Sequence, residues 1–318
     1  MLMRSHLGKF RFMLVVALSL LLFSSVHSQQ RQTAAAYRAI TIATEPKAVV
    51  WVDGIRFGRA DEAGRLEITT VSPGAHTIRV RADGFKEKNQ PLTAAQRGEV
   101  KIALVETDDA AELAFQEAER LTSEDRQKAA EAYRRAIKAR PNYPEANLAL
   151  ARVLLDSGDT EGAMRALVVA RRIRPGYAEA SAVEGRIHKE SGEESKAMAA
   201  YKRAISEGKG FQPEAYAGLG ILYKEKAEGS GGSGDFANET LYFDESAKNL
   251  RMALKQLSGA PDTIVIYQLL GLIYERQNKH TDAIATYEEF LRIFPDSAEA
   301  TAVRSFIVQL KKDMAAKN

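Results

Sequence analysis

Histidines, cysteines and clustered carboxylates are the residues that could carry catalysis or bind a metal, and this chain offers few of them. Its 318 residues include five histidines and no cysteine. The histidines are His6, His27, His76, His188 and His280, and no two of the last three share a helix at metal-ligand spacing. The sequence has no nucleophile elbow, phosphate-binding glycine loop or dinucleotide-binding fingerprint. We therefore predict a protein that is not an enzyme and that needs neither a cofactor nor a metal.

A period of 34 residues organises the sequence between residues 129 and 204. Three columns follow it, namely Ala129, Ala163 and Ala197; Tyr133, Leu167 and Tyr201; and Ala136, Ala170 and Ala204. A period of this length in helix-favouring sequence predicts pairs of helices that stack on one another. Stacks of this kind generally bind other proteins, so the period favours a binding function over catalysis.

The same region resembles the tetratricopeptide repeat (TPR). The resemblance rests on small residues where paired helices approach, aromatic residues between them, and a proline after the second helix. These residues are Leu150, Ala151, Leu154, Gly158, Ala163, Leu167, Ala170 and Pro175 in the second unit, Gly185, Gly192, Ala197, Tyr201 and Ala204 in the third, and Tyr267, Gly271, Tyr274, Asn278, Ala283, Tyr287, Phe290 and Pro295 in the fifth. It implies an all-α superhelix of about five helical hairpins over residues 110–296, with a capping helix and tail over residues 297–318.

The resemblance also implies a binding surface, because the first helix of each pair lines the concave face of such a superhelix. Carried over position by position, a partner-binding groove would be lined by Leu148, Arg152, Arg186, Lys189, Ile221, Lys224, Gln268 and Leu272. The arginines at 152 and 186 would stack one repeat apart, and so would the two lysines. These cations predict a basic groove surface that suits an acidic or C-terminal peptide segment. In the alternative interpretation these charges are solvated and pair with Glu179, Glu190 and Glu225.

A glycine- and serine-rich run interrupts the fourth unit. Residues 229–234 read Gly-Ser-Gly-Gly-Ser-Gly, and about 14 extra residues separate the first helix of this unit from Ser246. Such composition predicts a flexible insertion over about residues 229–243. A tolerated loop is the simpler interpretation, and a functional lid is the alternative.

Residues 38–106 have the periodicity of strands. Apolar residues occur at every second position in pairs such as Val50 with Val52 and Ile78 with Val80, and Asp53-Gly54 is a turn. About 70 residues of this kind predict a small all-β sandwich with a limited core.

The β region resembles the PEGA domain. The order of landmarks carries the resemblance: Glu45-Pro46-Lys47-Ala48 before an apolar strand, then Asp53-Gly54, Gly58, Ser72-Pro73-Gly74 before a strand that begins at His76, and Gly84-Phe85. The family's tetrapeptide stands here without its glycine. The resemblance implies an extracytoplasmic module, often attached to other envelope domains, whose ligand is generally not established.

Trp51 is the aromatic residue of interest in this module. It lies on the face of its strand opposite Val50 and Val52. A tryptophan there either offers a platform for a sugar ring or closes the sandwich, and both interpretations remain open.

Residues 1–28 have the pattern of a secretory signal peptide, followed by a tether over residues 29–37. Arg4, Lys9 and Arg11 precede an apolar run over residues 13–23, and small residues precede Gln29. The run is shorter than the roughly 20 residues of a membrane span. We therefore expect cleavage, no stable membrane span afterwards, and a periplasmic or extracellular location. An uncleaved N-terminal anchor helix is the alternative.

Charge narrows the range of partners. The chain has 45 Lys and Arg against 42 Asp and Glu, and removing the three N-terminal cations makes these numbers equal. A neutral mature protein argues against general nucleic-acid or membrane-surface binding. The expected function is a non-catalytic protein–protein interaction adaptor or scaffold of the bacterial cell envelope. The alternative is a glycan- or cell-wall-binding protein that uses the PEGA-like domain, with the repeats serving assembly.

Overall fold

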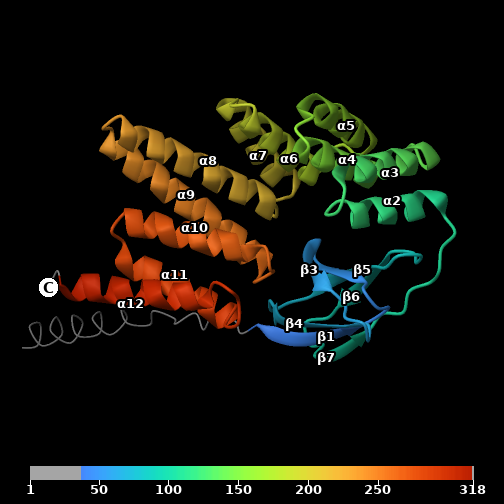
Figure 1. Cartoon of the computed structure of the whole chain (residues 1–318), viewed down its shortest axis with the longest axis horizontal. Coiled ribbons are helices and arrows are strands. Elements are labelled where there is room, and N and C mark those ends of the chain that lie inside the picture. The colour runs from blue at the N-terminus through green and yellow to red at the C-terminus, as the bar shows by residue number, and fades with distance from the viewer. Residues whose placement is uncertain (1–36, 317–318) are drawn as a thin grey trace, which may run out of the picture. The chain divides into compact units, whose positions relative to one another are not determined.

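The structure is a computed structural model, and it describes residues 37–316 of the chain. In this part a β region of seven strands precedes eleven helices (Figure 1). The strands are β1 Arg38–Ala43, β2 Val49–Val52, β3 Ile55–Arg59, β4 Arg65–Val71, β5 His76–Arg81, β6 Lys88–Leu92 and β7 Gly98–Lys101. The predicted signal peptide and nearly all of the tether lie outside the described residues.

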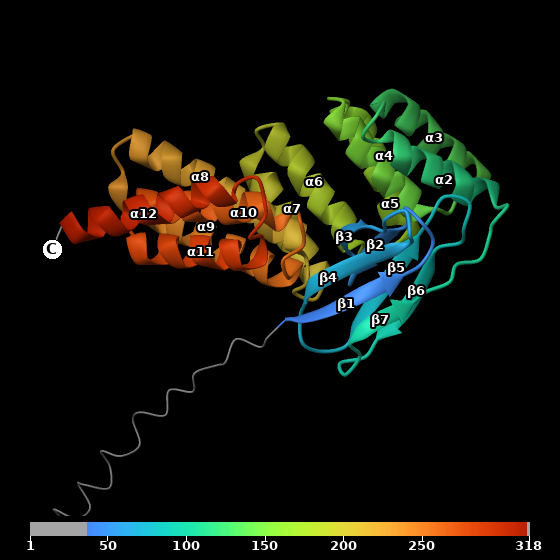
Figure 2. The same ribbon diagram turned by 60° about the horizontal axis from the view of Figure 1, so that its bottom comes forward.

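The strands form two sheets that share one hydrophobic core. In the three-stranded sheet β1 lies between β4 and β7, antiparallel to β4 and parallel to β7 (Figure 2). The other sheet is antiparallel throughout, in the order β3-β2-β5-β6. Ile42 of the first sheet and Val50 and Ile78 of the second are fully buried in the common core. The structure therefore contains the small β region that the alternating pattern predicts.

Some strands differ from the predicted pattern. Ile102 and Leu104 also alternate along the sequence and would predict a strand. They follow β7 and belong to no strand, although the Ile102 amide donates to the Ala43 carbonyl at 2.8 Å. The pattern gave no sign of β6, because Leu92 is its only buried residue and the other four are polar or proline. Strands at the edge of a sheet need little apolar surface, so periodicity misses them.

The helices form five hairpins and one further helix, as the 34-residue period predicts. The hairpins are α2 Ala110–Leu121 with α3 Arg126–Ala139, α4 Pro144–Asp156 with α5 Thr160–Ile173, α6 Ala178–Glu190 with α7 Glu194–Glu207, α8 Pro213–Gly232 with α9 Phe236–Leu257, and α10 Thr263–Arg276 with α11 His280–Ile293. The last helix, α12 Ala300–Ala316, packs on α11 and buries Val303, Ile307 and Leu310.

Side-chain caps explain where several helices begin. The carboxylates of Asp109, Asp125, Asp159 and Asp235 each accept a hydrogen bond from a backbone amide in the first turn of the helix that follows. Those amides have no partner within the helix, so an aspartate at this position stabilises the helix start. The segment Thr107-Asp108-Asp109 therefore lies between the β region and the helical region, and Asp109 begins the first helix.

Glycine allows the paired helices to approach closely. A Cβ atom added at Gly271 would lie 2.2 Å from the ring of Tyr287, and one at Gly185 would lie 2.6 Å from the ring of Tyr201. Each ring therefore occupies the space that a side chain at the glycine would need. This is the packing that the small and aromatic columns of the sequence predict.

The predicted insertion at residues 229–243 is helical instead of forming a loop. The glycine- and serine-rich run completes α8, a turn follows at residues 233–235, and α9 begins at Phe236. Two contacts hold the lengthened helices together: the rings of Tyr223 and Tyr242 stack at 6.2 Å, and Phe243 is buried. Pairing along this hairpin offsets the low helix propensity of glycine, which the composition of the run alone could not show.

The turn after β5 is attached to the first helix of the stack. The Gln116 side chain on α2 accepts a hydrogen bond from the Gly84 amide at 2.8 Å and donates one to the Phe85 carbonyl at 2.7 Å. Arg81 is buried, pairs with Glu119 of α2 at 2.6 Å, and lies over the ring of Phe115. Polar and cation–π contacts thus connect β5 and the turn after it to the helices.

Candidate partner-binding surface

The eight residues predicted to line a groove lie on the first helices of four hairpins. Leu148 and Arg152 are on α4, Arg186 and Lys189 on α6, Ile221 and Lys224 on α8, and Gln268 and Leu272 on α10. Contacts of α4 with α6 and of α6 with α8 bring three of these helices side by side. They do not present one uniform surface, because their charges and exposure differ along the stack.

Arg152 makes a two-point ion pair across the stack. Its Nη1 and Nη2 atoms donate to the two carboxylate oxygens of Glu214 on α8, at 3.1 and 2.5 Å. Burial lowers the pKa of the guanidinium, but the Glu214 carboxylate outweighs this effect and the net shift is upward. Glu214 lies 62 residues further along the chain, so this pair ties the second hairpin to the fourth.

The other cations of this surface also have acidic partners. Arg186 pairs with Asp156 of the preceding hairpin and with Glu190 at 2.8 Å. Lys189 pairs with Glu225 of the following hairpin at 3.1 Å, and Lys224 pairs with Glu228 of its own helix at 2.7 Å. The groove surface over α4, α6 and α8 is therefore close to electrically neutral. Two of the three acids named in the alternative interpretation, Glu190 and Glu225, form these ion pairs.

The surface becomes apolar on α10. Val265 is 68% exposed and Leu272 is 54% exposed, with the exposed Gln268 between them at helical spacing. These three residues, here called the α10 patch, lie on one face because residues three and seven positions apart share a side of a helix. Ile221 on α8 is half-buried, and Leu148 on α4 is buried within the hydrophobic core.

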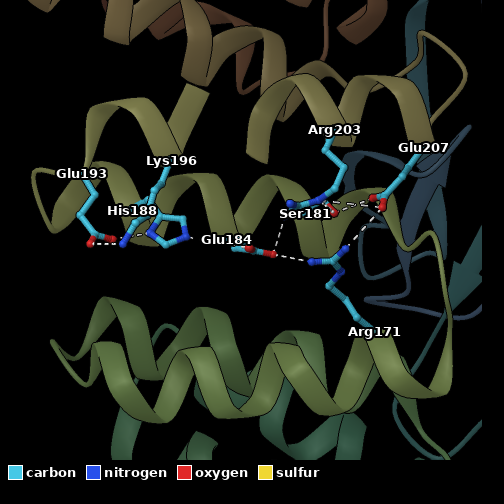
Figure 3. Close-up of polar contacts among 8 residues, drawn as sticks. All are labelled: Arg171, Ser181, Glu184, His188, Glu193, Lys196, Arg203 and Glu207. Carbon is cyan, nitrogen blue, oxygen red and sulfur yellow. Dashed lines mark hydrogen bonds and ion pairs between the residues drawn. The ribbon is translucent and has the colours of Figure 1, made fainter. Parts of the chain in front are cut away.

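A second polar constellation, which periodicity did not reveal, lies between α5, α6 and α7 (Figure 3). Glu184 accepts from Arg171 of α5 at 2.7 Å and pairs with Arg203 of α7 at 2.6 Å. The buried Ser181 donates to Glu207 at 2.5 Å, and Arg171 lies 3.5 Å from the same carboxylate. We call these five residues the Glu184 cluster. Two arginines and two carboxylates balance within it, so it links three helices without adding net charge.

His188 extends this constellation toward the end of α6. Its Nδ1 atom lies 2.6 Å from Glu193, which also accepts from Lys196 at 2.6 Å, and its Nε2 atom lies 3.9 Å from Glu184. Hydrogen bonds from Lys196 and then from His188 lower the pKa of Glu193. Ion pairs and hydrogen bonds thus connect the residues shown in Figure 3 to one another.

Trp51 is enclosed in the β region. Its side chain and backbone together are 9% exposed, and the Arg79 guanidinium lies 4.2 Å above the centre of its ring. A sugar would have to displace Arg79 to stack on that face. The glycan platform remains a prediction from sequence.

The described residues contain no group of three or more His, Asp or Glu side chains that could hold a metal ion. Between residues 37 and 316 no helix is both long and apolar enough to cross a membrane.

Comparison with protein-family models defines the repeats. Two tetratricopeptide-repeat models match, one over residues 120–187 and the other over residues 267–297. The chain contains tetratricopeptide repeats. The matched segments cover α3 to most of α6 and most of α10 with α11, and the helices between them, α7 to α9, continue the stack of hairpins. No curated protein matches this chain.

Solved structures with similar helical stacks include a thermophilic TPR protein of Thermus thermophilus. It has a TM-score of 0.48 and 19% identity, over 63% of this chain and 100% of the other. A crystal structure of MamA protein has a TM-score of 0.41 and 22% identity, over 61% and 96%. The pilF protein of Pseudomonas aeruginosa has a TM-score of 0.44 and 13% identity, over 62% and 82%. At these scores we take no functional conclusion from them.

TPR proteins typically mediate protein–protein interaction and are typically not catalytic. The repeats found by the family models therefore make a protein-binding role the general expectation for this stack.

Proposed function

We propose that this chain is a non-catalytic adaptor of the cell envelope, and that the first-helix face of its repeats binds a segment of a partner protein. The observation that carries the proposal is the α10 patch on a TPR stack. Val265 and Leu272 are more than half exposed beside a polar Gln268, and exposed apolar side chains on a repeat protein favour an interaction surface.

The cations on α4, α6 and α8 already have acidic partners, and this limits the kind of segment that can bind there. An acidic peptide would have to compete with Glu214 for Arg152 and with Glu225 for Lys189. A segment that inserts an apolar side chain against Leu272 avoids this competition. Lys224→Gln would distinguish the two, since Lys224 pairs within its own helix and its neutralisation weakens only the binding of an acidic segment.

The proposal has two further parts: the protein is exported, and its β region is a PEGA-like module. Support for export is the basic-then-apolar order of the N-terminal sequence, and support for a PEGA-like module is the order of turns from residue 45 to residue 85. Cell fractionation with mass measurement of the mature N-terminus tests the first. An intact Met1 would contradict cleavage.

The binding face can be tested by site-specific photocrosslinking in cells. A photoreactive residue at Gln268 should trap a protein partner, and Val265→Asp with Leu272→Asp should weaken the affinity of that purified partner at least about tenfold. The reason is that two buried charges without counter-ions would replace two apolar contacts.

A matched control is Val308→Asp on α12, because Val308 is 53% exposed and lies outside the first-helix face. It should leave the affinity unchanged. Equal loss with the control, or crosslinks that form at Val308 and not at Gln268, would rule out this face.

Sedimentation with purified peptidoglycan tests the glycan alternative. Pelleting that depends on Trp51 would favour it. Trp51→Phe is the suitable variant, because it retains an enclosed ring beside Arg79.

A further inference from the structure

Charge in the first three hairpins is segregated between the two kinds of helix. In the second helices α3, α5 and α7, Lys and Arg outnumber Asp and Glu by eleven to four. In the first helices α2, α4 and α6, Asp and Glu outnumber Lys and Arg by eight to four. The near-zero net charge of the chain therefore conceals a basic face and an acidic face.

Five cations on α3, α5 and α7 are exposed and have no ion pair among the described residues. One of them, Arg126, begins α3, and the other four are Arg134 and Lys138 on α3, Arg172 on α5 and Lys202 on α7. The 34-residue period relates them, because Lys138 and Arg172 are one repeat apart and Arg134 and Lys202 are two repeats apart. We call these four residues the basic strip.

The surroundings of the basic strip keep it positive. Val168, one repeat after Arg134, lies among the four cations and is 59% exposed. Three acids on the same helices are exposed: Glu131, three residues before Arg134 and without an ion pair in the described part of the chain, Glu161, which pairs with Arg165 at 3.3 Å, and Glu194, which pairs with Lys226 at 2.6 Å. None of them forms an ion pair with a member of the strip. An exposed valine surrounded by cations is suited to a surface that is anionic and partly apolar.

The Glu184 cluster links α5 and α7, two of the three helices that carry the strip. Arg171 and Arg203 point inward to Glu184 (Figure 3). Their sequence neighbours Arg172 and Lys202 are exposed. The contact of Arg171 with Glu207 joins α5 directly to α7, so Arg172 and Lys202 project from two helices that are held together.

The spread of the strip decides what kind of partner fits. Helices α3, α5 and α7 belong to three successive hairpins, so the four charges are spread along the stack instead of being gathered at one point. A laterally uniform anionic surface can meet all four charges at once, and each Lys or Arg near such a surface contributes about 1 kcal/mol.

We propose that the basic strip docks the protein on the surface of an anionic lipid bilayer, with Val168 at the level of the headgroups. This inference does not depend on the partner-binding face, which lies on the first helices. An adaptor built in this way would hold a membrane on one side and a protein on the other.

The test compares binding to vesicles of phosphatidylglycerol and phosphatidylethanolamine in equal amounts with binding to phosphatidylcholine vesicles, by sedimentation of the full chain. The neutral vesicles measure any contribution of the apolar N-terminal run. We expect clearly tighter binding to the anionic vesicles, and a steep loss as salt is raised. The combined variant R134E/K138E/R172E/K202E should weaken that binding by a few hundred-fold, at about fivefold for each cation.

The control variant reverses four exposed cations elsewhere that also have no ion pair among the described residues, namely Arg56, Lys86, Lys255 and Lys312. It changes the net charge equally and should weaken vesicle binding less than about tenfold. If the fourfold glutamate variant unfolds, the corresponding glutamine variant replaces it.

Three results would overturn the proposal. The first is equal binding to anionic and neutral vesicles, and the second is an equal loss in the control variant. The third is a strip variant that no longer binds polyglutamate but binds anionic vesicles as tightly as the unmodified protein. The strip would then be a binding surface for an acidic protein.

Discussion

At the scale of single residues, Glu184 is the most informative side chain of the stack. It stands one repeat after Leu150, a buried residue, so a carboxylate occupies a position that is apolar in the preceding hairpin. Its side chain is 17% exposed and lies between Arg171 and Arg203. A partly buried carboxylate of this kind is held by its partners, and its removal leaves Glu207 as the one acid of the cluster beside two arginines.

Glu184→Gln should therefore lower the free energy of unfolding by about 1–3 kcal/mol, measured by urea denaturation. The matched control is Glu161→Gln, since Glu161 also pairs with an arginine but is 89% exposed. That change should cost less than about 0.5 kcal/mol. Equal effects of the two variants would show that the Glu184 cluster adds no stability.

The stability of the first helix depends on pH through the carboxylate of Asp109. Its carboxylate accepts from the Ala111 and Glu112 amides and pairs with Arg140 at 2.7 Å. The backbone hydrogen bond from Glu112, followed by the bond from Arg140, lowers the pKa of Asp109 in the folded protein. A carboxyl group with a depressed folded pKa stabilises the protein above its unfolded pKa, and that contribution is lost as the pH falls through the folded pKa.

Asp109→Ala should thus destabilise the protein by about 1 kcal/mol near neutral pH. Between about pH 5 and pH 2 the difference from the unmodified protein should shrink, because the cap carboxylate becomes protonated there. Urea denaturation across this range measures it. A difference that stays constant down to the lowest pH would contradict a role for the ionised cap.

At the scale of elements, the fourth hairpin shows how tertiary pairing overrides local sequence. Gly229 lies in α8, and a Cβ atom added there would meet nothing within 4 Å. Gly231, two residues later, would meet the Glu239 side chain at 2.5 Å. The same helix end therefore contains one glycine with open space around it and one whose substitution would require the Glu239 carboxylate to move.

Gly229→Ala should raise the free energy of unfolding by about 0.5–1 kcal/mol, because alanine loses less backbone entropy than glycine in a helix. Thermal and urea unfolding measure this. Gly234→Ala is the comparison, since Gly234 lies in the turn with a φ of 82° and should be destabilised by a Cβ atom. No gain at Gly229 would indicate that this end of α8 is not helical in solution.

Much of the helical architecture could be predicted, because the packing of one hairpin on the next requires the same small and aromatic residues in each. Gly271 and Tyr287 are an example: both were visible as repeat positions, and the structure places the ring over the glycine. The charges were less predictable. Arg152 pairs with Glu214 two hairpins away, and a period of one repeat does not specify such a partner. The same is true of Glu184, whose two arginines come from different helices.

At the scale of the whole molecule, the helical stack is not a single core. One cluster of buried residues extends from Ala111 to Ile187, a smaller one from Ala182 to Leu222, and a third from Ala227 to Leu310. In a repeat protein each hairpin contacts chiefly its neighbours, so a local defect is felt mainly by the cluster that contains it. The Glu184 cluster lies where the first of these cores gives way to the second.

Phe290→Ala tests this division. Phe290 is fully buried in the third cluster beside Tyr267 and Phe294, so its loss should cost about 3–5 kcal/mol locally. Hydrogen exchange should accelerate strongly in α9 to α12 and little in α2 to α5. Uniform acceleration over all eleven helices would instead show one cooperative unit.

The length of the fourth hairpin has a consequence for helical phase. α8 has 20 residues and α9 has 22, against 13 in α4 and 14 in α5, so each helix of the pair is extended by seven or eight residues (Figure 1). Two turns of helix take about 7.2 residues, so an extension of this size returns side chains to nearly the same direction. Removing about seven residues from both helices should therefore leave the rest of the stack aligned. Removing five residues from one helix would instead rotate its remaining side chains by about 140° and turn its apolar stripe away from its partner.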